Sequence, residues 1–172
     1  MRVHRVRQRS RLVRAMYIRN VLFGGEDSLV STVGLLSGIA AAGSAQSAVI
    51  LTGVVLIFVE ALSMAVGSFL SENSAEEYLA KAEVPARDAV IGGVLMFFSY
   101  FLLGLIPLGP YLIFDVSTAF WFSIALSTAA LFGLGLVSGT EFRVHPFKTA
   151  LRMAVLGGSA IAIGVAVGQL VT

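Results

Sequence analysis

Residues 89–140 decide the class of protein: they read AVIGGVLMFFSYFLLGLIPLGPYLIFDVSTAFWFSIALSTAALFGLGLVSGT and contain a single charged residue, Asp115. A membrane-spanning helix needs about 20 consecutive, mostly apolar residues, so this stretch predicts two successive spans, one on each side of Asp115. In the whole chain of 172 residues, 57% are hydrophobic and 13% are charged. An ordinary soluble domain has about 25% charged residues. Because so few charged side chains cannot coat a folded body of this size, the composition predicts an integral membrane protein.

Three further spans are expected beside this pair. Charge-free stretches also run over residues 28–59 and 153–172. The first stretch is too long for one spanning helix and too short for two. We therefore expect one helix to begin upstream of it, a turn at 42–47, and a second helix that continues past Glu60. The predicted fold is all-α, with a further turn at 108–114 and five membrane-spanning helices near 20–42, 48–71, 88–108, 112–137 and 148–170.

The basic residues fall on one side of this five-helix topology. All 12 lie before the first helix, between the second and third, or around the start of the fifth. The positive-inside rule makes this side cytoplasmic, which places the N-terminus inside and the C-terminus outside. We expect a basic cytoplasmic arm at 1–16, a membrane domain at 17–172 and a short cytoplasmic linker at 73–88. The arm is expected to bind anionic lipid headgroups, and nucleic acid is not expected as a partner.

Three acidic residues are expected within the membrane: Glu26 and Asp27 in the first helix and Glu60 in the second. A charged side chain at that depth costs about 2.5–3.5 kcal/mol or more, which indicates a function. For Glu26 or Asp27 the alternative is an acid near a helix end that reaches the interface. Asp115 is expected at the outer interface, so we assign it no function within the membrane.

Each of the two helices carries a polar stripe, because residues three or four apart share a face. The first stripe is Asp27, Ser31, Gly34 and Gly38, and the second is Glu60, Met64, Gly67, Ser68 and Ser71. Small residues leave room for an ion, although Gly34-x-x-x-Gly38 is also the spacing of a helix-packing seam. Carboxylates suit Mg²⁺, Ca²⁺ or Mn²⁺, and an added thioether favours Fe²⁺. A methionine also serves as filler, so the Met64 signal has a structural alternative.

The expected ligands are too few in one chain to replace the water around a metal ion. A homodimer with the cation pathway at its two-fold interface would double them. Carboxylates that bind metal in one state and protons in another couple the two movements, which makes Asp27 and Glu60 the candidates for proton coupling. No resident cofactor is expected.

Two stretches resemble the vacuolar iron transporter family. Residues 17–38, YIRNVLFGGEDSLVSTVGLLSG, are similar to its first helix, and residues 60–71, EALSMAVGSFLS, to its second. Residues 106–111 resemble its Pro-x-x-Pro-Tyr turn, and residues 150–158 resemble part of its last helix. The resemblance implies a five-helix homodimer that exports Fe²⁺, and often Mn²⁺, from the cytoplasm in exchange for protons. It implies Asp27 and Met64 as pathway ligands. The protein is then expected in the plasma membrane of a prokaryote, or in a vacuolar or other organellar membrane of a eukaryote.

The chain departs from the family pattern in ways that shift the expected site. Glu26 replaces the asparagine before the aspartate, and Ser68 replaces the glutamate of the second helix. We expect Glu60 to take over the work of that missing acid. The expected metal ligands are Glu26, Asp27, Glu60, Met64 and Glu72.

The linker at 73–88 lacks the Glu- and Met-rich domain that collects metal in vacuole-loading relatives. Its acids Glu76 and Glu77 are candidates for attracting metal at the cytoplasmic entrance, or they belong to an ordinary solvated connector.

Two other functions stay open: a non-transporting membrane module that packs against a partner, and a passive cation channel. An enzyme is not expected. His145 has no nucleophile partner in view, and Gly24-Gly25 lacks the strand and lysine of a phosphate-binding loop.

Overall fold

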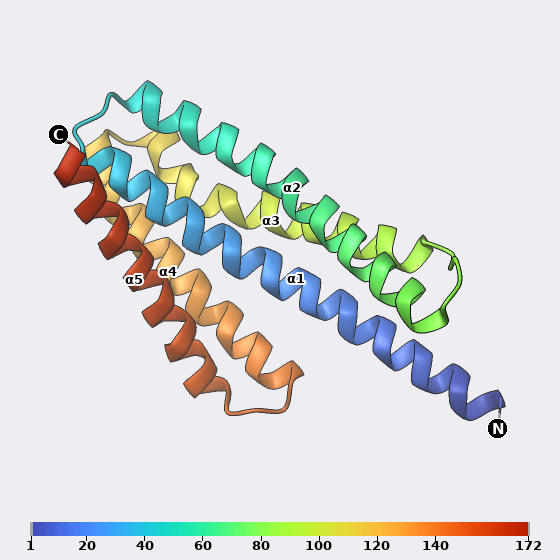
Figure 1. Cartoon of the computed structure of the whole chain (residues 1–172). Helices are drawn as coiled ribbons and strands as arrows, with labels where there is room; N and C mark the ends of the chain where they lie inside the picture. The colour runs from blue at the N-terminus through green and yellow to red at the C-terminus, as the bar shows by residue number, and fades with distance from the viewer. Residues whose placement is uncertain (1, 172) are drawn as a thin grey trace.

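The computed structural model describes residues 2–171, with side chains described from Arg11 onward, and these residues form five helices. They are α1 (Arg2–Ala41), α2 (Gln46–Ala80), α3 (Arg87–Ile113), α4 (Val116–Glu141) and α5 (Pro146–Val171). The central helix is α1, which contacts all four others (Figure 1). α2 packs mainly on α3, and α4 packs mainly on α5. The prediction of an all-α fold is confirmed.

Four helices, α2 to α5, are long and apolar enough to cross a membrane. α1 is long enough, but its second half carries Glu26, Asp27 and several hydroxyl side chains that lower its hydropathy. Of the five expected spans, the last four are therefore confirmed as long and apolar enough to cross a membrane.

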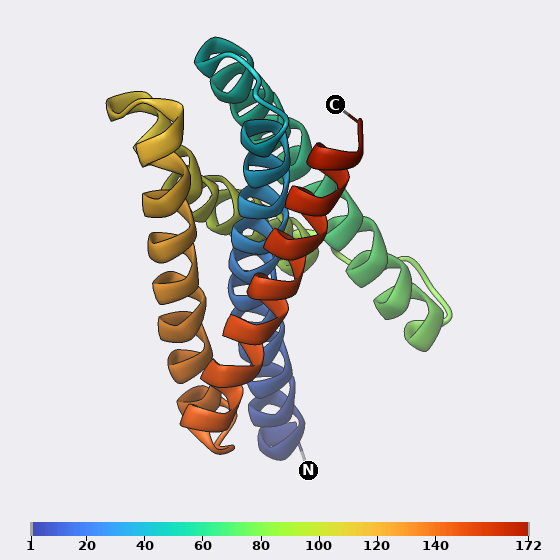
Figure 2. The ribbon, with the colours of Figure 1, turned by 90° about the vertical axis from the view of Figure 1, so that its left-hand side faces the viewer.

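The connections that carry basic residues lie at one end of the bundle. The start of α1, the α2–α3 loop and the α4–α5 loop all point toward this end, which we call the basic end, with the α4–α5 loop set apart from the other two (Figure 1). The α1–α2 loop, the α3–α4 loop and the end of α5 lie at the opposite end in both ribbon views (Figure 2). The arginine side chains before Arg11, on which the lipid-headgroup expectation partly rests, lie outside the described side chains.

Several predicted helix ends are wrong. α1 begins at Arg2 instead of residue 20, so no break in the helix marks the expected boundary of the arm at residue 16. α2 continues to Ala80, and a left-handed Lys81 (φ 51°) ends it. Much of the expected linker at 73–88 is therefore helical. The turn between α1 and α2 falls within 42–47, as predicted.

The prediction of a turn at 108–114 is also wrong, because α3 continues through Pro107 and Pro110 to Ile113. Membrane helices tolerate proline where neighbouring helices supply hydrogen bonds to the backbone. Pro107 and Pro110 cannot donate to the carbonyl oxygens of Leu103 and Ile106, four residues earlier. The hydroxyl of Ser123 on α4 donates to the carbonyl oxygen of Pro107, at 2.7 Å, and fastens α4 to this part of α3. Only residues 114 and 115 separate α3 from α4.

Asp115 lies at the end of a helix, as predicted, and forms the N-cap of α4. Its carboxylate accepts a hydrogen bond from the backbone N–H of Thr118, at 3.2 Å. Hydrogen bonds from Ser117 and Thr118 lower the pKa of Asp115 to about 2.

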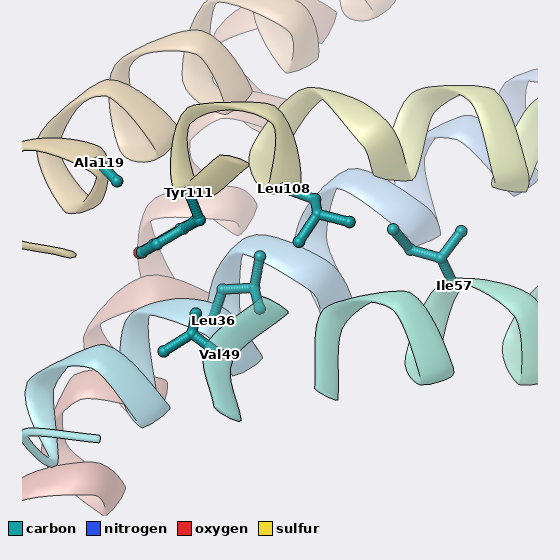
Figure 3. Packing of buried hydrophobic residues seen from close by; sticks show 6 residues of the cluster. All are labelled: Leu36, Val49, Ile57, Leu108, Tyr111 and Ala119. Atoms are coloured by element: carbon teal, nitrogen blue, oxygen red, sulfur yellow. The ribbon is translucent and has the colours of Figure 1, made fainter. Parts of the chain in front are cut away.

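Side chains from four helices form the core nearest the α1–α2 and α3–α4 loops. This cluster is Leu36, Val49, Ile57, Leu108, Tyr111 and Ala119 (Figure 3). A second cluster, Leu29, Leu131 and Met153, joins α1 to α4 and α5.

Glycines bring α1 and α5 into close contact. A Cβ atom added at Gly38 would lie 2.6 Å from the carbonyl oxygen of Gly164, and one added at Gly164 would collide with the carbonyl oxygen of Gly34. Gly34-x-x-x-Gly38 is therefore a packing seam, which was the alternative interpretation of this spacing.

Candidate functional site

The carboxylates of Asp27 on α1 and Glu60 on α2 come close enough together for their charges to interact. Both side chains are half-buried. Sequence spacing placed each acid on its own stripe, and the fold brings the two stripes together at this point. Two like charges that interact in this way attract a cation or a proton.

Tyr100 on α3 completes this site, and the sequence analysis missed it. The side chain is fully buried, and its hydroxyl lies 2.8 Å from the Oγ of Ser31, one helical turn from Asp27. It also interacts electrostatically with both Asp27 and Glu60. The sequence offered one signal for Tyr100, which is its hydroxyl group in the middle of a mostly apolar span.

Glu26 faces a different part of the bundle from Asp27. Its strongest interaction with another charged group is with Arg152 in the second turn of α5. Adjacent residues project about 100° apart around a helix with 3.6 residues per turn. The structure therefore pairs Asp27, and not its neighbour, with Glu60.

A cavity of about 600 Å³ lies between α1, α2 and α3, on the side of Glu60 toward the basic end. We call it the α1–α2–α3 cavity. Its lining includes Met64, one turn from Glu60, and Phe23, one turn from Asp27. The other lining residues are Arg19, Asn20, Ser63, Gly67, Ser68, Ser71 and Met96.

A second hollow of about 600 Å³, which we call the α1–α5 groove, lies on the other side of Asp27. Ser31, Gly34 and Gly38 line it on α1, and Gly164 and Gly168 are among its lining residues on α5. Its remaining walls are almost entirely aliphatic. The three residues Phe23, Asp27 and Ser31 follow one another at intervals of four on one helix face. Asp27 thus lies between the cavity and the groove.

Glu72 does not share a site with Glu60. The two residues are 12 positions apart on α2, which corresponds to about 18 Å along the helix. Glu72 is only 8% exposed, and its Oε1 accepts hydrogen bonds from Arg19 Nη2 and Asn20 Nδ2, both at 2.7 Å, and from Ser68 Oγ at 3.3 Å. Its Oε2 is buried without a hydrogen-bond partner, in space that Gly92 leaves free, because a Cβ there would lie 2.5 Å from this atom. Glu72 therefore fastens α2 to α1 beside the α1–α2–α3 cavity.

The acids expected at the metal entrance lie beyond Glu72, near the end of α2. Glu76 and Glu77 are half-buried, and the Oε1 of Glu77 accepts a hydrogen bond from Asn73 Nδ2 at 2.9 Å. The cavity lining on α2 ends at Ser71, so neither glutamate contributes to it.

The predicted ligands are divided among these places. Asp27 and Glu60 are together, Met64 is one turn away in the cavity, Glu26 faces Arg152, and Glu72 is bonded to Arg19 and Asn20. In the part of the chain that the structure describes, no three Asp, Glu or His side chains converge closely enough to hold a metal ion. A single chain thus offers an acidic pair beside a thioether and not a closed coordination site.

Acidic side chains held among long apolar helices, with hollows at the neighbouring turns, indicate an integral membrane protein with a function inside the membrane. Residues 18–90 and 76–169 match the sequence pattern of the VIT family, and the chain belongs to that family. The resemblance noted in the first two helices is thereby confirmed. Because the family consists of transporters, the chain is a membrane transporter and not an enzyme.

Relatives are found in an archaeon and in a plant. An uncharacterized protein of Methanocaldococcus jannaschii, MJ0645, is 27% identical over 164 residues, which cover 84% of each chain. Vacuolar iron transporter homolog 1 of Arabidopsis thaliana is 26% identical over 165 residues, and homolog 3 is 27% identical over 163 residues. Each plant alignment covers 87% of this chain and 80% of the relative.

Proposed function

We propose that this protein moves divalent transition-metal ions, Fe²⁺ and also Mn²⁺, out of the cytoplasm in exchange for protons. The observation that carries the proposal is the position of Asp27 and Glu60, two carboxylates on neighbouring helices whose charges interact, with hollows at the neighbouring turns. The names of the two plant relatives support iron as the cargo.

The proposed path follows one face of α1. A metal ion enters the α1–α2–α3 cavity from the basic end, reaches Asp27 and Glu60, and leaves through the α1–α5 groove. The two carboxylates repel each other when both are charged, so the pair is stabilised either by a dication or by protonation. Metal binding releases protons from such a pair, and protonation releases the metal. This exchange couples the two movements.

We propose that α1 also crosses the membrane, with the basic end of the bundle in the cytoplasm. Placing the basic connections of the bundle inside satisfies the positive-inside rule. The N-terminus is then inside, and the end of α5 is outside. The basic arm at 1–16 binds anionic headgroups in this arrangement, and Glu76 and Glu77 lie on the cytoplasmic side where metal arrives.

The protein acts as a homodimer in this proposal. Phe23 is exposed on the face of α1 that bears the half-buried Asp27 and Ser31. This face lies between α2 and α5. These two helices lie on either side of α1 and do not pack substantially against each other. A carboxylate facing lipid is costly, and a second copy of this face would cover it and double the ligands. The pathway then lies at the two-fold interface, lined by Asp27, Glu60 and Met64 from both copies.

Uptake of Fe²⁺ or Mn²⁺ into liposomes containing the purified protein tests this function. We expect flux that increases when a proton gradient is imposed in the exchanging direction. Flux that ignores the proton gradient would instead indicate a passive channel. Absence of flux from the unmodified protein would indicate a non-transporting module.

A further inference from the structure

Two methionines, one from each of two helices, line the α1–α2–α3 cavity. Met64 comes from α2, and Met96 comes from α3. Met96 is only 3% exposed, yet it lies in the cavity wall. Only Met64 was singled out from the sequence, because Met96 belongs to the charge-free stretch that begins at residue 89.

A glycine on α1 makes space for the Met96 sulfur. A Cβ atom added at Gly24 would lie 2.8 Å from the Sδ of Met96 and 3.1 Å from its carbonyl oxygen. Glycine inside a helix costs about 1 kcal/mol relative to alanine. The bare backbone at Gly24 thus allows α1 and α3 to approach closely with the thioether between them.

The other polar groups in the cavity wall are neutral, with one exception. Asn20, Ser63, Ser68 and Ser71 offer amide and hydroxyl groups, and among the described side chains Arg19 is the one charged lining residue. Its guanidinium lies 2.7 Å from Glu72. A cation in this cavity would therefore pass two methionine side chains and several neutral oxygens before it reached Asp27 and Glu60.

We propose that Met64 and Met96 form a selectivity site that admits Fe²⁺ in preference to Mn²⁺ and Mg²⁺. The inference rests on the proposed transport function and assigns its discrimination step to the cavity. Thioether sulfur favours softer transition metals, whereas carboxylate oxygen favours Mg²⁺, Ca²⁺ and Mn²⁺. The Asp27–Glu60 pair offers oxygen ligands only, so selection for the softer ion takes place where the sulfurs are. Met96 is the specificity-determining residue that this structure adds to Met64.

Met96→Leu, a substitution that removes the sulfur and keeps much of the volume, tests the proposal. The matched control is Met153→Leu, because Met153 is similarly buried but packs against Leu29 and Leu131, outside the cavity. Fe²⁺ uptake into liposomes is measured with increasing Mn²⁺ or Mg²⁺ as competitor. Loss of a group that supports a bound metal typically lowers affinity 10–100-fold, so we expect Met96→Leu to lower the preference for Fe²⁺ about tenfold. Met153→Leu should keep the original preference, and an unchanged preference in Met96→Leu overturns the proposal.

A second measurement is independent of transport. X-ray absorption of the Fe²⁺-loaded protein in detergent should show sulfur among the nearest neighbours of iron, with a reduced signal in Met96→Leu. A shell of oxygen and nitrogen alone overturns the proposal even if Met96→Leu is inactive. If sulfur is bound but the unmodified protein moves no metal, the transport function fails and the binding site stands.

Discussion

The Nη2 of Arg19 lies 2.7 Å from the Oε1 of Glu72, and this ion pair connects α1 to α2 beside the α1–α2–α3 cavity. Glu72 is buried, whereas the Arg19 side chain is mostly exposed. The nearly inaccessible Asn20 donates to the same oxygen, so Glu72 satisfies a buried donor as well as the arginine.

Replacement of this carboxylate should destabilise the protein. We expect Glu72→Ala to lower the free energy of unfolding by about 1–3 kcal/mol, because one N–H of the buried Asn20 amide loses its acceptor and only the hydrogen bond to Ser68 Oγ remains. Thermal unfolding in detergent measures the effect as a lower Tm. Glu83→Gln, in the exposed α2–α3 loop, is the control and should leave the Tm unchanged. Equal Tm values for Glu72→Ala and the control would show that the Glu72 cluster does not hold α1 against α2.

Two glycine substitutions should change stability in opposite directions. Gly38→Ala places a Cβ 2.6 Å from the carbonyl oxygen of Gly164, and such overpacking typically costs about 1–3 kcal/mol. Gly158→Ala, also within a helix, meets no atom within 4 Å. It should stabilise the protein by up to about 1 kcal/mol through helix propensity. Unfolding midpoints of the two variants in one detergent provide the comparison, and a stabilising Gly38→Ala would contradict the observed α1–α5 seam.

The lengths of the helices show where sequence reasoning succeeds and where it fails. Charge-free stretches located all five helices, because the membrane-spanning part of a helix must be apolar. The same signal misplaced several ends, since charge stops the apolar stretch without stopping the helix. α2 thus continues past Glu72 to Ala80, and α3 continues through two prolines.

Several residues of the site could be predicted from the sequence, but their arrangement in space could not. Helical spacing placed Asp27 and Glu60 on polar stripes, yet only the packing of α1 against α2 and α3 shows that they meet. The same packing separates Glu26 from Glu60 and turns Gly34 and Gly38 toward α5. Tyr100 and Met96 lie in an apolar span, so nothing in their spacing distinguished them from core residues.

The N-cap of α4 predicts a pH dependence of stability. Because hydrogen bonds lower the pKa of Asp115 to about 2, below the usual value of about 3.9, its ionised form stabilises the folded state. This contribution is fully present above the unfolded-state pKa and is lost as the pH falls toward 2. Asp115→Ala should therefore lower the Tm at pH 6, and the difference from the unmodified protein should shrink between pH 4 and pH 2. A difference that stays constant over this range would contradict the assignment.

Removal of one hydroxyl group should affect transport more than folding. Tyr100→Phe loses the 2.8 Å contact with Ser31 beside Asp27 and keeps the buried ring. We expect slower uptake of Fe²⁺ into liposomes, with a loss of roughly 1 kcal/mol or less in folding stability. Tyr78→Phe, at a highly exposed position on α2, is the matched control. Equal uptake rates for the two variants would remove Tyr100 from the site.

The central claim is that Asp27 and Glu60 act together as the metal- and proton-binding pair. Fe²⁺ uptake driven by a pH gradient, measured for Asp27→Asn, Glu60→Gln and Glu26→Gln in the same liposomes, tests it most directly. We expect either change within the pair to reduce uptake at least about tenfold, which corresponds to about 1.4 kcal/mol. Glu26→Gln, whose side chain faces Arg152, should retain most of the activity. Undiminished uptake by Glu60→Gln, or a greater loss in Glu26→Gln than in Asp27→Asn, would contradict the claim.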